Sequence, residues 1–221
     1  ADGAGGAVIT WWDGRDPALG FGNPGIHALR IQSDGSLAPG WQANGNLVSA
    51  VGGAPTPVPD GTGGALLVWS DYRDHMDDDV YVLRMRSDGT RDPRWPVNGL
   101  PVTDNRALDD FTDLAADGQG GAYLCWDQYS FATGDQVLIQ HLTGAGSVAS
   151  GWPAVGLVVP SHVVSPYPHI VADGGRGAIV TWTDIDERAR ALRFAPDGPV
   201  AVELSLASAS SSEACAFDTF A

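Results

Sequence analysis

Short apolar runs separated by turn residues follow one another along the whole chain. Gly64 to Asp71 (GALLVWSD) is the clearest run, and its length and continuous apolar character are typical of a strand buried on both faces. Similar runs lie at Gly6 to Asp13 and at Gly177 to Asp184. No window carries the 3.6-residue apolar period of a helix over three turns. The pattern therefore predicts an all-β chain of short strands.

Further strands are predicted between these runs. Val80 to Arg86 (VYVLRMR) follows the clearest run as a second strand, and Leu100 to Thr103 predicts a third. The proline-containing stretch from Pro55 to Pro59 predicts a strand with edge or entry character, because proline cannot donate to a sheet ladder. Counterparts in other parts of the chain are Ile26 to Gln32, Val137 to Leu142 and Pro166 to Ala172.

A motif of the form Asp-Gly-x-x-Gly-Ala occurs four times, and a tryptophan always stands nine residues after its aspartate. The aspartates are 58, 57 and 56 residues apart. Four units of about four strands at this period predict a single four-bladed β-propeller of antiparallel blades, with the tryptophan as a wedge between blades. A β-sandwich explains the strands but not the period. The four pairs are Asp2 and Trp11, Asp60 and Trp69, Asp117 and Trp126, and Asp173 and Trp182.

Two tight turns also recur inside the units, at Asp88-Gly89 and at Trp95 to Gly99 (WPVNG) in the second unit. Together with Asp60 to Ala65 (DGTGGA) and Trp69 to Arg73 (WSDYR), they resemble the repeat of secreted bacterial β-propeller proteins. The resemblance extends to about residue 200. It departs at Gln128, where the aspartate is lost, and in the fourth unit, which lacks the second tryptophan. It implies an extracellular or cell-surface protein and brings no catalytic motif with it.

Charged residues that recur from unit to unit are predicted to be architectural. The aspartates after the repeated tryptophan are expected to accept hydrogen bonds from turn backbone or arginine. Three arginines share one register and are predicted to pair between blades. These residues are Asp13, Asp71 and Asp184, and Arg30, Arg84 and Arg193.

The two ends of the chain are out of phase with the repeat. Residues 1–206 hold the four repeats, and residues 207–221 form a Ser/Ala-rich spacer followed by a predicted strand. The strand that precedes Asp60 has no counterpart before Asp2, so the terminal strand is predicted to complete the first blade. It does so either in its own ring or in a neighbouring copy by β-strand addition, which builds a fibre or surface assembly. The predicted contact residues are Ala214, Cys215, Phe217 and Phe220.

The chain contains two cysteines, Cys125 and Cys215. A disulfide between them would fix the tail to the third blade, within one ring or across a contact between copies. The alternative is a buried thiol on a strand and an unrelated thiol in the tail.

The composition limits the classes of molecule that the protein can bind. Twelve Lys and Arg residues stand against 27 Asp and Glu, which gives a formal net charge of −15. Such a protein repels nucleic acid and anionic membrane surfaces, because phosphate binding needs a cationic face. No apolar run reaches the roughly 18 residues of a membrane span. The acidity, the Ser/Thr-rich stretches and the absence of lysine favour an extracellular location.

One acidic loop is a candidate metal site. Carboxylates on a flexible loop are the ligands that Ca²⁺ prefers. The spacing here lacks the alternating order of a calcium-binding loop, so a solvated acidic loop is the alternative. No other cofactor is expected, since no phosphate-binding loop, nucleophile elbow or Cys-x-x-Cys is present. The candidate ligands are Asp74, Asp77, Asp78 and Asp79.

Aromatic residues follow the second strand of the first three blades, where loops gather on one face. Their rings would stack on sugar, or else pack between neighbouring loops. The sequence thus predicts an extracellular, non-enzymatic structural or adhesive propeller that self-associates through its terminal segments. A carbohydrate-binding propeller is the alternative, and a glycoside-active enzyme is the second alternative, because 27 acidic residues always allow some catalytic pair. The candidate stacking residues are Trp12, Phe21, Tyr72 and Tyr129.

Overall fold

The computed structural model describes residues 2–14, 25–73, 78–103, 107–159, 167–184, 186–196 and 198–204. Every regular element in these ranges is a β-strand. The strands form four separate antiparallel sheets, one from each sequence repeat. The prediction of an all-β chain is confirmed. No helix in the described ranges could cross a membrane.

Neighbouring strands in each sheet are consecutive along the chain. The first sheet consists of β1 (Ala7–Asp13), β2 (Gly25–Ile31) and β3 (Asn46–Ser49). The second consists of β4 (Gly53–Pro59), β5 (Ala65–Asp71), β6 (Asp79–Met85) and β7 (Leu100–Pro101). The third consists of β8 (Leu108–Ala116), β9 (Ala122–Ser130), β10 (Gly134–Leu142) and β11 (Leu157–Val158). The fourth consists of β12 (His169–Ala172), β13 (Ala178–Thr183), β14 (Ala189–Ala195) and β15 (Gly198–Leu204).

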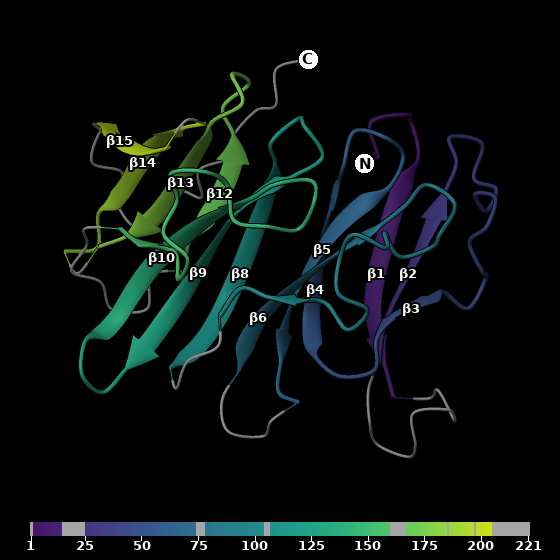
Figure 1. Ribbon diagram of the computed structural model, residues 1–221, viewed down its shortest axis with the longest axis horizontal. Helices are drawn as coiled ribbons and strands as arrows, with labels where there is room; N and C mark the ends of the chain where they lie inside the picture. The colour runs from purple at the N-terminus through teal and green to yellow at the C-terminus, as the bar shows by residue number, and fades with distance from the viewer. Residues whose placement is uncertain are drawn as a thin grey trace.

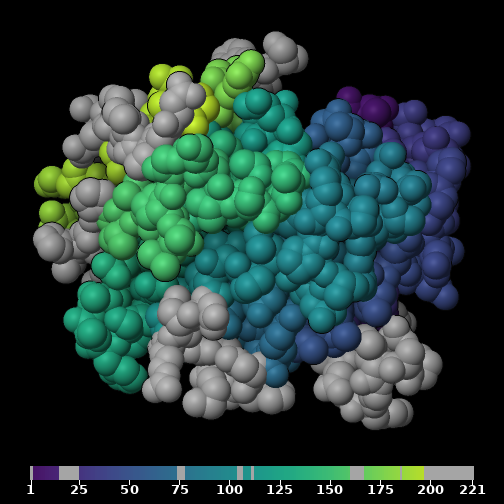
Figure 2. Space-filling model, in the orientation of Figure 1, coloured from purple at the N-terminus to yellow at the C-terminus, as the bar shows by residue number. Residues whose placement is uncertain are grey.

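The sheets pack one behind the next in chain order. β4 lies beside β1 on one side and β8 on the other, and β8 also lies beside β12. Figure 1 shows the first and the fourth sheet at opposite ends of this row, and the space-filling view shows the same order across the molecular surface (Figure 2). No strand pairing joins the first and fourth sheets among the described residues. Closure into a four-bladed ring therefore stays a prediction.

The Asp-Gly-x-x-Gly motif is a structural turn at the start of each central strand. Oδ1 of Asp60 accepts the backbone N–H of Thr62 at 2.7 Å and of Gly64 at 3.0 Å. Oδ2 of the same carboxylate pairs with Arg84 at 2.7 Å. A Cβ on Gly64 would lie 2.3 Å from the carbonyl oxygen of Met85, so only glycine fits. The recurrence of this motif is thus explained by backbone geometry.

The three arginines of the shared register pair inside their own sheets. Arg30 contacts Asp2, Arg84 contacts Asp60 and Arg193 contacts Asp173, with N–O distances of 2.6 to 2.7 Å. The prediction that these ion pairs join different blades is wrong. The reason is local: β1, β5 and β13 each start five residues after the aspartate, and the arginine stands near the end of the neighbouring strand.

Three of the repeated tryptophans, Trp69, Trp126 and Trp182, lie between sheets, as the wedge prediction requires, whereas Trp11 of the first sheet is half-buried. Trp69 and Trp126 are fully buried. Burial of one indole ring stabilises the fold by roughly a few kcal/mol. One apolar cluster joins the first three sheets and includes Leu124 and Trp126, and a second joins the third and fourth sheets and includes Tyr123 and Cys125. Alternate residues of β9 therefore face the second and the fourth sheet.

Candidate functional site

The same polar contact joins the first sheet to the second and the second sheet to the third. Nε1 of Trp41 donates to the carbonyl of Ser87 at 2.9 Å, and Nε1 of Trp95 donates to the carbonyl of Gly144 at 3.4 Å. Each acceptor stands just before the tight turn of the following repeat. The same side chain of one sheet thus binds the same backbone position of the next.

A second contact also repeats, at the Asp-Gly-x-x-Gly turn. A Cβ on Gly63 would lie 3.1 Å from Nη1 of Arg30, which belongs to the preceding sheet, and Gly120 has the same relation to Arg84 at 3.3 Å. The hydroxyl of Tyr123 donates to the carbonyl of residue 176, the equivalent turn position of the fourth sheet, at 2.8 Å. The second and third sheets therefore each have a forward face, whose side chains contact the turn of the following sheet. Each also has a turn that side chains of the preceding sheet contact.

The first sheet leaves one of these faces open. Ile9 and Trp11 hold the positions that Leu67 and Trp69 hold in the second sheet. Leu67 and Trp69 are fully buried, whereas Ile9 is 43% exposed and Trp11 is half-buried. Thr10, on the opposite face of β1, donates to the carbonyl of residue 55 in β4. The face of Ile9 and Trp11 therefore points away from the second sheet.

The first sheet also has an open edge. Its three described strands run in the order β1-β2-β3, with β1 at the edge. In the other sheets, the strand equivalent to β1 pairs with one further strand, which is β4, β8 or β12. An edge strand presents unpaired backbone groups that can bind a further strand. The described part of the first sheet is thus one strand short, as the repeat phase predicts.

The fourth sheet is open on the opposite side. Val180 and Trp182 pack on the third sheet. Ile179 alternates with them and is half-buried, while Val171 and Arg193, its partners across the ladder, are exposed. In the other sheets, residues at these positions contact the turn of the following sheet. The two ends of the row therefore carry complementary halves of the internal interface.

A buried carboxyl lies between the third and fourth sheets. Asp127 is 9% exposed, and its Oδ1 accepts no hydrogen bond in the described structure. Burial, followed by the negative charges of Asp135, Asp110 and Asp109, raises its pKa from 3.8 to about 7. Asp110 stands directly opposite in the ladder between β8 and β9. Asp127 was not recognised as a candidate from the sequence, although the equivalent residues Trp12 and Ser70 are uncharged.

The predicted metal loop is only partly described. Asp74 and Asp77 lie outside the described residues. Asp79 is buried and lies 3.4 Å from the hydroxyl of Thr103, and the carbonyl of Asp78 accepts the N–H of Asp109 at 3.0 Å. In the parts of the chain that are described, no three acidic, His or Cys side chains form a metal-binding group. The calcium hypothesis stays a prediction.

The candidate stacking aromatics lie on different sheets. Trp12 is 60% exposed on β1, and Phe21 lies outside the described residues. Tyr72 is half-buried, with its hydroxyl 3.5 Å from the carbonyl of Gly52. Tyr129 is 37% exposed and makes an edge contact with Phe131. The described structure therefore gives packing partners for Tyr72 and Tyr129 and does not gather these rings into one platform.

The cysteine and tail predictions fall largely outside the described residues. Cys125 is a fully buried free thiol. Burial raises its pKa well above the usual range, and the nearby charge of Asp113 adds to this. Residues 205–221, with Cys215, Ala214, Phe217 and Phe220, are not described. The disulfide and the tail contact stay predictions.

No family model matches the chain, and no curated protein matches it. Among solved structures, the chain is similar to the endo-arabinase from Bacteroides thetaiotaomicron VPI-5482, with a TM-score of 0.42 and 12% sequence identity. The match covers 84% of this chain and 67% of the arabinase.

Proposed function

We propose that this protein is an extracellular, non-enzymatic structural or adhesive module of propeller type that works by associating with further copies of itself. The observation that carries the proposal is the open face of the first sheet. Ile9 is 43% exposed at a position where the equivalent Leu67 and Leu124 are fully buried by a preceding sheet. An exposed apolar face whose equivalents in the other sheets are buried is stabilised when a partner covers it.

The partner face that fits is the far side of the fourth sheet. Inside the row, the second, third and fourth sheets each pack on the forward face of the sheet before them. Arg193 holds the register position from which Arg30 and Arg84 reach the next turn. In a second copy, the turn formed by residues 2–6 is its equivalent target. Such a contact is heterologous, and it generates either a closed ring of copies or an open filament.

The open edge of β1 offers a second, cooperating contact. A strand added there would complete the first sheet to four strands and remove the exposed edge. The tail residues Ala214, Cys215, Phe217 and Phe220 are the proposed donors, from the same chain or from a neighbour. The Ser/Ala-rich spacer at 207–212 gives the donor strand its reach.

Sedimentation and light scattering across a concentration series test the association. We expect the mean mass to rise with concentration and the Ile9→Asp variant to lower the association constant at least tenfold, because it buries a charge in the contact. Val97→Asp is the matched control, since Val97 is 66% exposed in a turn away from this face. A wild-type protein that stays monomeric at every concentration would contradict the proposal. So would an equal effect of the two variants.

A further inference from the structure

The second sheet fills the space at its hairpin end with a charged network. The carboxylate of Asp71 accepts from Nε1 of Trp69 at 2.8 Å and from Arg73 at 2.6 and 2.7 Å. The guanidinium of Arg73 lies 4.0 Å from the ring centre of Tyr81 and also donates to the carbonyl of Asn98 at 2.9 Å. These side chains close the gap between the hairpin and the turn before β7.

The third sheet lacks every charged part of this network. Trp126 pairs with Leu138 across the ladder as Trp69 pairs with Tyr81, which fixes the equivalence of the two sheets. The indole N–H of Trp126 has lost its carboxylate partner and is unbonded in the described structure. The replacements are Gln128 for Asp71, Ser130 for Arg73, Leu138 for Tyr81 and Val155 for Asn98.

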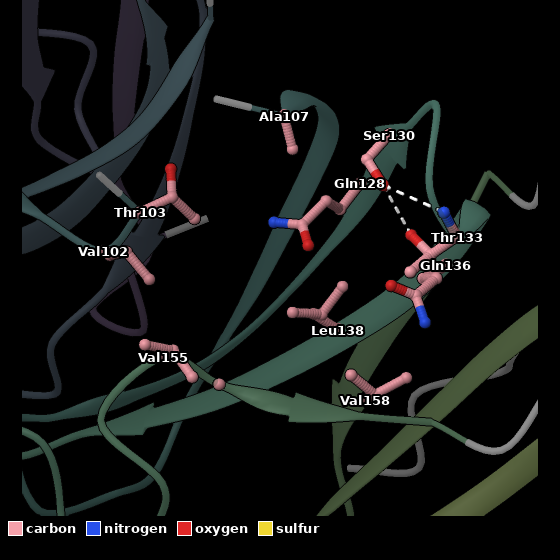
Figure 3. Close-up of a pocket in the computed structure, with 11 residues that line it drawn as sticks. Val102, Thr103, Ala107, Gln128, Ser130, Thr133, Gln136, Leu138, Val155 and Val158 are labelled. Atoms are coloured by element: carbon pink, nitrogen blue, oxygen red, sulfur yellow. Dashed lines mark hydrogen bonds between the residues drawn. The ribbon is translucent and has the colours of Figure 1, made fainter. Parts of the chain in front are cut away.

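A cavity opens where these side chains are missing. Its volume is about 470 Å³, within the range of small-molecule sites. It lies between the second sheet, which contributes Val102 and Thr103, and the strands β9, β10 and β11 of the third sheet. Figure 3 shows the Gln128 amide extending into the space between these two walls. The departure of the repeat at residue 128 therefore coincides with a hollow beside the third sheet.

The polar groups of the described residues that line the cavity are all neutral. Gln136 stands opposite Gln128 in the ladder, and its amide makes no hydrogen bond within the described structure. Gln128 uses only its Nε2, which donates to Asp109 at 2.8 Å and leaves its carbonyl oxygen available. The hydroxyls of Ser130 and Thr133 lie 2.6 Å apart at the hairpin. None of the lining residues that the structure describes carries a charge.

We propose that this cavity binds a neutral, hydroxyl-rich ligand of the size of one or two sugar rings. A carboxamide offers a donor and an acceptor side by side, which matches a pair of adjacent hydroxyls. Leu138 and Val158 form an apolar wall for the C–H face of a ring. Anionic ligands are disfavoured, because the carboxylate of Asp109 is buried behind Gln128 and the net charge is −15. The site uses different residues from the proposed self-association and stands independently of it.

Calorimetric titration with a panel of neutral mono- and disaccharides, both hexoses and pentoses, tests the site. Glucuronate and a sulfated hexose serve as charged counterparts. We expect at least one neutral sugar to bind with a millimolar or lower dissociation constant and the charged sugars not to bind. Gln136→Leu should weaken that binding about tenfold or more, because it removes both hydrogen-bonding atoms of the amide. Gln119→Leu, an exposed glutamine in the turn before β9, is the matched control.

A second variant introduces the charged network of the second sheet into the third sheet. The combination Gln128→Asp, Ser130→Arg and Leu138→Tyr should fill the cavity and abolish sugar binding, while thermal unfolding stays cooperative. Should this combination not fold, Gln136→Leu alone decides the question. The proposal is overturned if no neutral sugar binds at 10 mM, if only charged sugars bind, or if Gln136→Leu and Gln119→Leu bind equally well.

Discussion

The indole N–H of Trp69 donates to the carboxylate of Asp71 two residues farther along β5, at 2.8 Å and on the same face of the strand. The carboxylate is 1% exposed and also pairs with Arg73. A buried carboxylate with several donors stabilises a fold only as a complete set, because a donor or acceptor left alone in the interior costs free energy. The interaction therefore joins the interblade wedge to the hairpin of its own sheet.

Replacement of Asp71 by alanine should lower the free energy of unfolding by about 3 kcal/mol, because Trp69 and Arg73 both lose their acceptor. Urea unfolding followed by tryptophan fluorescence measures the loss. Asp88→Ala is the control, since that carboxylate is exposed and bonds only within its own turn. Equal losses in the two variants would show that the buried set adds nothing to stability.

Asp127 should make stability fall as pH rises. Its folded pKa of about 7 lies above the ordinary value of 3.8, so the folded state holds a proton that the unfolded state releases between these two values. Stability from this group is complete below about pH 4 and is lost as pH rises through 7. Asp127→Asn should therefore raise the unfolding temperature at pH 8 more than at pH 5. Asp186→Asn, in an exposed turn of the fourth sheet, serves as control, and a pH-independent difference for Asp127→Asn would contradict the assignment.

Two glycines with different surroundings should respond differently to alanine. Gly64→Ala places a Cβ 2.3 Å from the carbonyl oxygen of Met85 and 2.7 Å from Asp60, so the backbone has to move. We expect a loss of about 2 kcal/mol or more in the free energy of unfolding. At Gly53 nothing lies within 4 Å of the added Cβ, and the variant should be neutral or slightly stabilised. Similar stabilities for the two variants would mean that the turn adapts.

Cys125 should react with thiol reagents only after unfolding. The thiol is fully buried, and burial raises its pKa well above the usual range, so little thiolate forms. In a Cys215→Ser variant, a disulfide-exchange reagent should modify no cysteine under native conditions and one cysteine in denaturant. Fast native labelling would show that the contact between the third and fourth sheets opens readily.

The sequence predicted the fold where a local rule fixes it. The Asp60 turn and the Trp69 wedge are readable because glycine geometry and an invariant spacing leave one arrangement each. The partners of Arg84 were predicted wrongly. Repetition shows that residues share a register, but it does not show whether their partner lies in the same sheet or in the next one.

The site was predicted less well, for a related reason. Gln128 was noticed as a departure from the repeat, yet a single lost aspartate does not reveal a cavity. The hollow depends on Ser130, Leu138 and Val155 as well, which come together only when β9, β10 and the turn before β11 are aligned. A comparison of equivalent positions between repeats would have revealed the cavity, whereas a search for motifs does not.

The packing of each sheet mainly on its chain neighbours also governs how the molecule comes apart. In a row of such units, stability is close to a sum of unit and nearest-neighbour terms, as in a one-dimensional Ising chain. The end units have one neighbour each and the central units have two, so opening starts at the ends. Amide exchange should therefore be fastest in β1 and β15 and slowest in β5 and β9, and a partner that covers the first sheet would protect it first.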